Sequence, residues 1–304
     1  MFEGVHTALV TPFKDGDVDE AGYRAHVDRQ FTAGVAGVVP VGTTGESPTL
    51  SHDEHRRVIE LAVEEGAGRG LVIAGTGSNS TREAISLTQA AEKAGANAAL
   101  LVAPYYNKPS QQGLFEHFKA IAEATTLPIV LYSIPGRCGI EIGVDTTARL
   151  AQTCPNIRAM KEAGGSVERV SQLEAATTGL ATRFEILSGD DSLTLPFMSV
   201  GALGVISVAS NLIPAEMVAL VSAMLEERWD EARALHRRYY RLFNALLKLD
   251  SNPVPIKTAL GLVGVIEPAV RRPLAPMRPA GINELKIILE QLEITSAQPS
   301  NTNS

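Results

Sequence analysis

The sequence is poor in cysteine and has no long hydrophobic run. Its 304 residues include only two cysteines, Cys138 and Cys154, which form no CxxC pair. A disulfide framework is therefore not expected, and a reducing compartment is indicated. No run of about 18 apolar residues is present, so we expect no membrane-spanning helix. The first residues lack the basic segment and apolar stretch of a secretion signal, which predicts a cytoplasmic protein.

An excess of positive charge is also missing. The chain has 27 Lys and Arg against 34 Asp and Glu, with a formal net charge of -7 at pH 7. No cluster of basic residues is interleaved with aromatic residues, so a nucleic-acid partner is not expected. The apolar content of 45% is that of a globular protein with a sizeable core.

Motifs for nucleotides and metals are absent. Residues 11–16, after the first apolar run, contain no GxGxxG sequence, and no Walker-type loop occurs. No HExxH motif is present, and His52 and His55 lie far from Glu83 in the sequence, so no metal site is predicted. The acidic pair Asp190 and Asp191 follows Gly189, where a phosphate site would need uncharged glycine-rich loops.

Eight short apolar runs alternate with longer amphipathic segments. The runs are mostly about 30 residues apart and are expected to be parallel strands covered on both faces, because several are continuously apolar. Several of the intervening segments open with Ser or Asp, which are good helix N-caps. The runs begin near Val5, Gly37, Gly70, Ala98, Pro128, Ile157, Arg183 and Gly204.

This alternation predicts an α/β fold, a (β/α)8 TIM barrel over residues 1–226. An open doubly wound sheet is disfavoured because the glycine-rich loop expected after its first strand is absent. A solenoid is disfavoured because the units share no repeated sequence. Residues 227–294 are expected to form a C-terminal helical extension, and the polar tail 295–304 is expected to be disordered. We predict helices at 229–249, 255–263 and 282–292.

Lys161 ends the sixth apolar run. A buried ammonium group is disfavoured by desolvation, and a neutral lysine amine is a nucleophile toward carbonyl carbon. The alternative is that Lys161 extends its amine into solvent. Functional sites of such barrels lie at the carboxyl ends of the strands, where other runs end in hydroxyl, phenol and guanidinium groups. These groups belong to Thr43, Thr44, Tyr105, Tyr106, Tyr132 and Arg137.

Each of these residues also has a structural interpretation. Thr43 and Thr44 could belong to an ordinary turn, Tyr132 could be a packed aromatic residue, and Arg137 could be a solvated charge. Together, an amine, phenols, hydroxyls and an arginine at one rim suit carbonyl chemistry on an anionic substrate.

Seven stretches in fixed order resemble the dihydrodipicolinate synthase / N-acetylneuraminate lyase family of Schiff-base aldolases. The resemblance extends from about residue 2 to about residue 292. It is carried by Gly42-Thr43-Thr44-Gly45-Glu46, Ala74-Gly75-Thr76-Gly77, Pro104-Tyr105-Tyr106, Tyr132-Ser133-Ile134-Pro135-Gly136-Arg137, Lys161-Glu162, Leu187-Ser188-Gly189-Asp190-Asp191 and Gly204-Val205-Ile206-Ser207.

The resemblance implies condensation of pyruvate with L-aspartate 4-semialdehyde to 4-hydroxy-tetrahydrodipicolinate, in lysine and diaminopimelate biosynthesis. It implies no metal or organic cofactor, and commonly a homotetramer built as a dimer of dimers. Thr43 together with Arg137 resembles the synthases of the family more than its neuraminate lyases. Another pyruvate-dependent aldolase, a 2-keto-acid dehydratase, or a non-catalytic binding protein on this fold are the alternatives.

The resemblance also implies residue roles. Lys161 matches the Schiff-base lysine and Tyr132 the general acid/base, while Thr43 matches a hydroxyl that links Tyr132 to a second tyrosine. That second tyrosine matches Tyr106, which the neighbouring subunit supplies in the family. Arg137 matches the residue that holds the carboxylate of the semialdehyde. Positions that contact pyruvate through the backbone match Thr44 and Ile206.

A second site is implied as well. The positions that bind L-lysine in feedback-inhibited members of the family match Ser47, His52, His55, Asn79, Glu83 and Tyr105. The alternative is a solvated helix start. The sequence departs from the family pattern at Pro48, at Ser133 in place of Asn, and at Cys138 in place of Thr.

Overall fold

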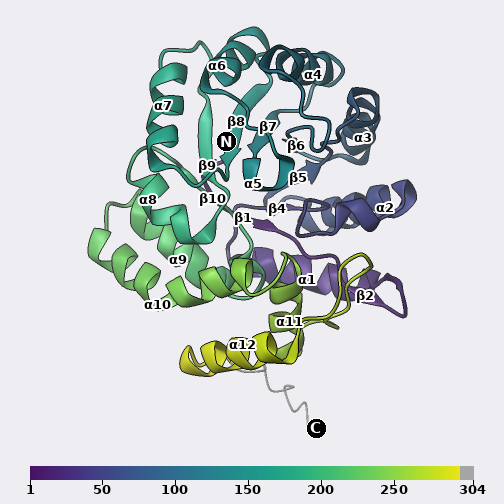
Figure 1. Ribbon diagram of the computed structural model, residues 1–304, viewed down its shortest axis with the longest axis vertical. Coiled ribbons are helices and arrows are strands. Elements are labelled where there is room, and N and C mark those ends of the chain that lie inside the picture. The colour runs from purple at the N-terminus through teal and green to yellow at the C-terminus, as the bar shows by residue number, and fades with distance from the viewer. Residues whose placement is uncertain (295–304) are drawn as a thin grey trace.

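A closed barrel of eight parallel strands forms the centre of the protein (Figure 1). The computed structural model describes residues 1–294, so the predicted disordered tail 295–304 lies outside the described residues. The strands pair in sequence order, and the last one, β10, pairs with the first, which confirms the predicted (β/α)8 barrel. The strands are β1 (Gly4–Ala8), β4 (Gly37–Val39), β5 (Leu71–Gly75), β6 (Ala98–Val102), β7 (Ile129–Ser133), β8 (Ile157–Glu162), β9 (Glu185–Ser188) and β10 (Gly204–Ser207).

The strands bury both of their faces, as continuous apolarity predicts. In β7 all five residues are buried. Val130 points into the barrel interior with Ile206, whereas Leu131 packs outward with Phe118 against the helices. Because each strand is covered on both sides, polar side chains can reach solvent most easily at the strand ends.

The helices that surround the barrel begin at the polar residues expected to cap them. The side chains of Ser51, Ser80, Ser110 and Ser166 each accept a hydrogen bond from a backbone N–H in the first helical turn. These helices and their neighbours are α1 (Glu20–Thr32), α2 (His52–Gly66), α3 (Thr81–Ala94), α4 (Gln111–Glu123), α6 (Val144–Thr153), α7 (Val167–Thr177), α8 (Thr194–Met198) and α9 (Pro214–Leu225).

Several short elements were not expected from the sequence. A two-stranded hairpin, β2 (Phe13–Lys14) and β3 (Asp17–Val18), follows β1, and a single helical turn, α5 (Pro135–Cys138), follows β7. Three 3₁₀ turns lie at Ser47–Thr49, Asp191–Leu193 and Ala209–Asn211. Elements of two to four residues are too short to produce a periodic pattern.

Three helices form the C-terminal part of the described chain: α10 (Trp229–Lys248), α11 (Val254–Leu262) and α12 (Pro279–Gln291). In Figure 1 they lie along one side of the barrel, with α12 outermost. Their apolar side chains join the same core cluster as Tyr23 and Val27 of α1. The division of the chain at residue 226 stays a prediction. No helix in residues 1–294 is long and apolar enough to span a bilayer.

Candidate active site

Lys161 lies at the carboxyl end of β8 and is almost completely buried. Its side chain is 6% exposed, and its Nζ lies 4.2 Å from the ring centre of Tyr132, its register partner on β7. Burial lowers the pKa of Lys161 from 10.5 to about 8; Asp191 raises this pKa and Arg137 lowers it further. About a tenth of the amine is therefore neutral at pH 7.

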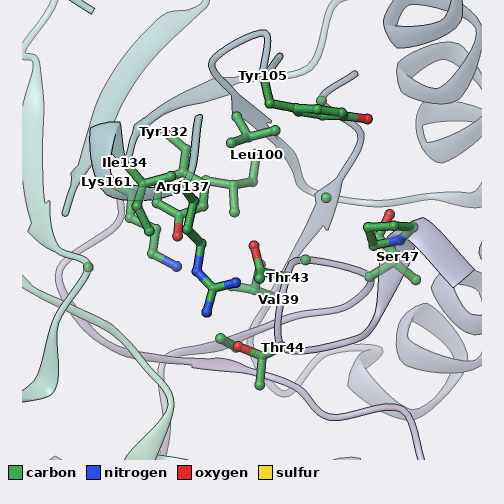
Figure 2. A pocket seen from close by; sticks show the side chains of 18 of the residues that line it. Val39, Thr43, Thr44, Ser47, Leu100, Tyr105, Tyr132, Ile134, Arg137 and Lys161 are labelled. Atoms are coloured by element: carbon green, nitrogen blue, oxygen red, sulfur yellow. The ribbon is translucent and has the colours of Figure 1, made fainter. Parts of the chain in front are cut away.

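Tyr132 supplies a phenol beside this amine. The ring is 5% exposed, and burial raises the pKa of the phenol, an effect that Arg137 and a hydrogen bond with Thr43 oppose. The phenol is thus protonated at neutral pH and can donate a proton. Figure 2 shows Lys161, Tyr132 and Thr43 facing one space.

The turn after β4 brings two hydroxyl groups to the same space. Gly45 N–H donates to the Gly42 carbonyl at 3.1 Å, which folds Thr43 and Thr44 into a tight loop. The Thr44 hydroxyl accepts a hydrogen bond from Asn252 Nδ2 at 3.0 Å. The motif is therefore a turn, and both threonines also line the cavity, while their roles in a reaction stay predictions.

Arg137 reaches the site from the short helix α5. Its side chain extends toward Thr43 and Thr44 in Figure 2, and its Nη2 donates to the Asn252 carbonyl at 3.4 Å. Asn252 therefore contacts two residues of the rim. No local sequence pattern indicates this role, because Asn252 lies 208 residues from Thr44.

Asp191 is a second buried residue whose place in the site was not expected. Its carboxylate, 1% exposed, accepts hydrogen bonds from the Ser207 hydroxyl and from the backbone of Val208 and Ala209 at 3.1 and 2.9 Å. Burial raises the pKa of Asp191 to about 6. In the sequence, Asp191 belongs to one of the stretches that carry the family resemblance, and its negative charge argues against a phosphate site.

Gly189 leaves room for the lysine. A Cβ atom at this position would lie 2.7 Å from Ala163 Cβ and 3.2 Å from Lys161 Cε. The first of these distances is too short for two carbon atoms, so a larger residue would displace the strand end that carries the amine.

One cavity of about 620 Å³ joins most of the predicted residues. Near Lys161 it is lined by Thr43, Thr44, Tyr132, Arg137 and Lys161, and its histidine end is lined by Ser47, His52, His55, Glu83 and Tyr105. Three predicted residues do not line it. Ile206 lies in the barrel interior, Asn79 donates to the Tyr105 carbonyl at 3.2 Å, and Tyr106 is 89% exposed with a left-handed φ of 73°.

The histidine end of the cavity contains a carboxylate with polar neighbours. Glu83 Oε1 lies 3.0 Å from His52 Nε2, and Glu83 accepts a hydrogen bond from the Ser78 hydroxyl. These contacts lower the pKa of Glu83, and the hydrogen bond from Ser78 has the largest effect. His55 lies 3.0 Å from the Gly75 carbonyl through Nε2, and burial lowers its pKa to about 4, so it is neutral at pH 7.

The sequence matches the profile of the dihydrodipicolinate synthetase family over residues 1–292. The chain belongs to this family. The resemblance inferred from the ordered motifs is therefore confirmed.

Relatives in the dihydrodipicolinate synthetase family are similar to this protein along nearly the whole chain. The 4-hydroxy-tetrahydrodipicolinate synthase of Persephonella marina is 48% identical over 291 residues, 95% of this chain and 98% of the relative. The structure of the enzyme of that name from Methylacidiphilum fumariolicum SolV superposes with a TM-score of 0.94 at 52% identity, covering 96% of each chain.

Two further structures of dihydrodipicolinate synthases are described with bound ligands. The chloride-inhibited enzyme of Acinetobacter baumannii, complexed with pyruvate, has a TM-score of 0.93 and 42% identity, covering 97% of this chain and 100% of that one. The enzyme of Cyanidioschyzon merolae, with lysine bound, has a TM-score of 0.92 and 40% identity, covering 96% and 99%.

Both departures from the family pattern near Tyr132 are buried. The Ser133 hydroxyl accepts a hydrogen bond from Ile142 N–H at 3.4 Å. Cys138 is 4% exposed and lines the cavity, and burial raises the pKa of its thiol to about 11. The thiol is thus protonated at neutral pH, which favours the interpretation of Cys138 as a small buried residue.

Proposed function

We propose that this chain condenses pyruvate with L-aspartate 4-semialdehyde to form 4-hydroxy-tetrahydrodipicolinate, in lysine and diaminopimelate biosynthesis. The observation that carries the proposal is the buried Lys161 beside Tyr132, in a chain 48% identical to a synthase of that name. The expected cytoplasmic location agrees with a biosynthetic reaction on small anions.

The reaction begins at the neutral amine of Lys161. Its nitrogen attacks the ketone carbon of pyruvate, and the ketone oxygen leaves as water, which gives an iminium ion. The positive nitrogen then accepts electrons while the pyruvate methyl loses a proton to give an enamine. We assign the donation and acceptance of these protons to Tyr132, with the neighbouring Thr43 hydroxyl as their route.

The enamine carbon then attacks the aldehyde of the second substrate. A new carbon–carbon bond forms, and the aldehyde oxygen takes a proton. The amino group of the semialdehyde next attacks the iminium carbon and releases Lys161, which closes the ring. We assign the carboxylate of the semialdehyde to Arg137, whose planar guanidinium can bind it through two hydrogen bonds. Backbone groups of Thr44 and Ile206 are assigned to pyruvate.

Tyr106 is assigned to the site of a neighbouring subunit. Its side chain is 89% exposed in one chain and lies outside the chain's own cavity. A large exposed aromatic ring on a loop suits a contact between copies of the chain. We therefore propose a homo-oligomer, built as a dimer of dimers, in which Tyr106 completes the proton route of the partner.

A coupled assay tests the reaction. Purified protein is supplied with pyruvate, L-aspartate 4-semialdehyde and dihydrodipicolinate reductase, and oxidation of the reduced nicotinamide is followed. We expect turnover that requires both substrates. If pyruvate becomes attached to Lys161 but the semialdehyde is not consumed, the chain is a different pyruvate-dependent aldolase or a 2-keto-acid dehydratase.

We also propose L-lysine as an effector at the histidine end of the cavity. Glu83 offers a carboxylate for an ammonium group, and His52 and Ser47 lie on the same lining. A structural neighbour is described with lysine bound. We predict that L-lysine inhibits turnover and raises the melting temperature. In Glu83→Gln, the L-lysine concentration needed for either effect should rise at least about tenfold.

The control for this test is Glu290→Gln, which removes a charge from the exposed surface of α12. It should keep the wild-type response to lysine. No response of the wild-type protein at millimolar L-lysine would contradict the effector proposal and leave the catalytic proposal intact.

A further inference from the structure

Helix α11 buries a charged side chain in an otherwise apolar environment. Lys257 is 0% exposed, and its Nζ donates to Glu46 Oε1 at 2.6 Å and to the Thr11 carbonyl at 2.7 Å. The Nζ also lies 4.1 Å from the ring centre of Phe13. Buried ion pairs contribute little net stability compared with well-packed apolar residues, so stability alone does not account for this one.

The partner of this lysine belongs to the loop that carries Thr43 and Thr44. Glu46 is 2% exposed, and its Oε2 accepts a second hydrogen bond from Arg271 N–H at 2.9 Å. Both bonds come from the C-terminal part of the chain, more than 200 residues away from Glu46. The carboxylate thus ties one end of the loop to the C-terminal part of the chain.

The backbone of this loop adopts conformations that need support. Glu46 has a φ of 55° and Val41 a φ of 50°, in the left-handed region that residues with side chains rarely adopt. Glu46 N–H donates to the Thr43 carbonyl at 3.1 Å, which transmits the position of Glu46 directly to Thr43. Strained backbone persists where its surroundings hold it, and such segments cluster at functional sites.

A second contact reaches the loop from the same part of the chain. Asn252, which precedes α11, donates to the Thr44 hydroxyl at 3.0 Å, and its carbonyl accepts from Arg137. The C-terminal segment therefore holds Thr44 through Asn252 and the loop end through Lys257.

We propose that Lys257 and Glu46 are positioning residues of the reaction, which hold the Thr43 hydroxyl against Tyr132. This inference rests on the proposed function, because it assigns the ion pair to the proton route of that reaction. Neither side chain lines the cavity, so both act through the loop rather than on substrate. Small displacements of a reacting group can lower rates by about 100-fold. Removal of the pair should therefore lower kcat by more than the loss of folded protein can explain.

Three variants test the pair: Lys257→Met, Glu46→Gln and the double variant. Lys257→Met leaves a buried carboxylate without its cation, so its melting temperature should fall. In the double variant no unpaired charge remains, so the melting temperature should return toward the wild-type value. We expect kcat, measured well below every melting temperature, to stay about 10- to 100-fold low in all three variants, with the KM for pyruvate near the wild-type value.

The matched control is Glu185→Gln. Glu185 is also a buried carboxylate, 3% exposed, but it binds the N-terminal amine and Phe2 N–H at the opposite end of the barrel. This variant should lose melting temperature without losing kcat. If Lys257→Met does not fold, Glu46→Gln and the double variant provide the same comparison.

Two results separate this proposal from the proposed function. A double variant that regains both melting temperature and kcat would show that the pair only stabilises the fold, and would overturn the positioning role. A wild-type protein that forms no borohydride-stable pyruvate adduct would instead overturn the proposed function. We expect the variants still to form that adduct, because Lys161 lies on a strand that the pair does not touch.

Discussion

Lys161 carries two opposing demands at the scale of a single residue. Burial lowers the pKa of its amine, so part of the amine is neutral and can react, but the protonated form that predominates at pH 7 then makes burial costly for the stability of the fold. Tyr132 is subject to the complementary effect, since burial keeps its phenol protonated. Burial thus supports the proposed roles of Lys161 as the nucleophile and of Tyr132 as the proton donor.

We predict that Lys161→Met makes the protein more stable and inactive. A pKa lowered from 10.5 to about 8 corresponds to about 3 kcal/mol of unfavourable free energy at pH 7. Below pH 8 the lysine is charged in both states and this cost is fully present. Between pH 8 and 10.5 the unfolded chain still binds the proton, so the cost falls as pH rises.

Urea unfolding measures this effect. The stability gain of Lys161→Met over the wild-type protein should be largest near pH 7 and roughly half as large at pH 9.5. Lys248→Met, which changes an exposed lysine on α10, should show no such dependence. A destabilised Lys161→Met variant at pH 7 would contradict the desolvation argument.

At the scale of the element, the turns after the strands decide which groups meet. Helix α5 has four residues, yet it directs Arg137 over the cavity, and the loop after β4 directs Thr43 and Thr44 to the same place. The barrel strands supply Lys161 and Tyr132. Specificity for the second substrate is therefore expected to depend on α5.

We predict that Arg137→Lys raises the KM for the semialdehyde by about 10- to 100-fold, with a small change in the KM for pyruvate. Lysine keeps the charge but cannot form the paired hydrogen bonds of a guanidinium group with a carboxylate. Steady-state kinetics with each substrate varied in turn measure the two constants. Equal increases in both would place Arg137 outside the second-substrate site.

Much of this architecture could be predicted from the sequence because its signals are local. Apolar runs located all eight barrel strands, and serine caps located helices such as α2 and α3. The strand-end rule then brought Lys161, Tyr132 and Arg137 to one rim. Contacts across the chain left no such signal, so Asn252, Lys257 and the buried role of Asp191 became visible only in three dimensions.

At the scale of the whole molecule, the exposed Tyr106 makes one chain incomplete for the proposed proton route. We predict that mixing Lys161→Ala with Tyr106→Phe, each nearly inactive, restores activity after the subunits exchange. In a symmetric dimer with shared sites, random pairing leaves about a quarter of all sites with both intact residues. The coupled assay, with native mass spectrometry to follow exchange, measures this recovery.

The control mixture combines Lys161→Ala with Tyr132→Phe. Both residues lie in the same chain's cavity, on neighbouring strands, so one site never regains both when whole subunits exchange. No recovery is expected there. Equal behaviour of the two mixtures after proven exchange would contradict the assignment of Tyr106 to the partner's site.

The most direct test of the central claim is reduction of the protein with borohydride in the presence of pyruvate, followed by peptide mass spectrometry. We predict one reduced pyruvate adduct, on Lys161, whose rate of formation rises with pH with a midpoint near 8, because the neutral amine is the attacking species. An adduct on another lysine, or no adduct at any pH, would contradict the Schiff-base mechanism.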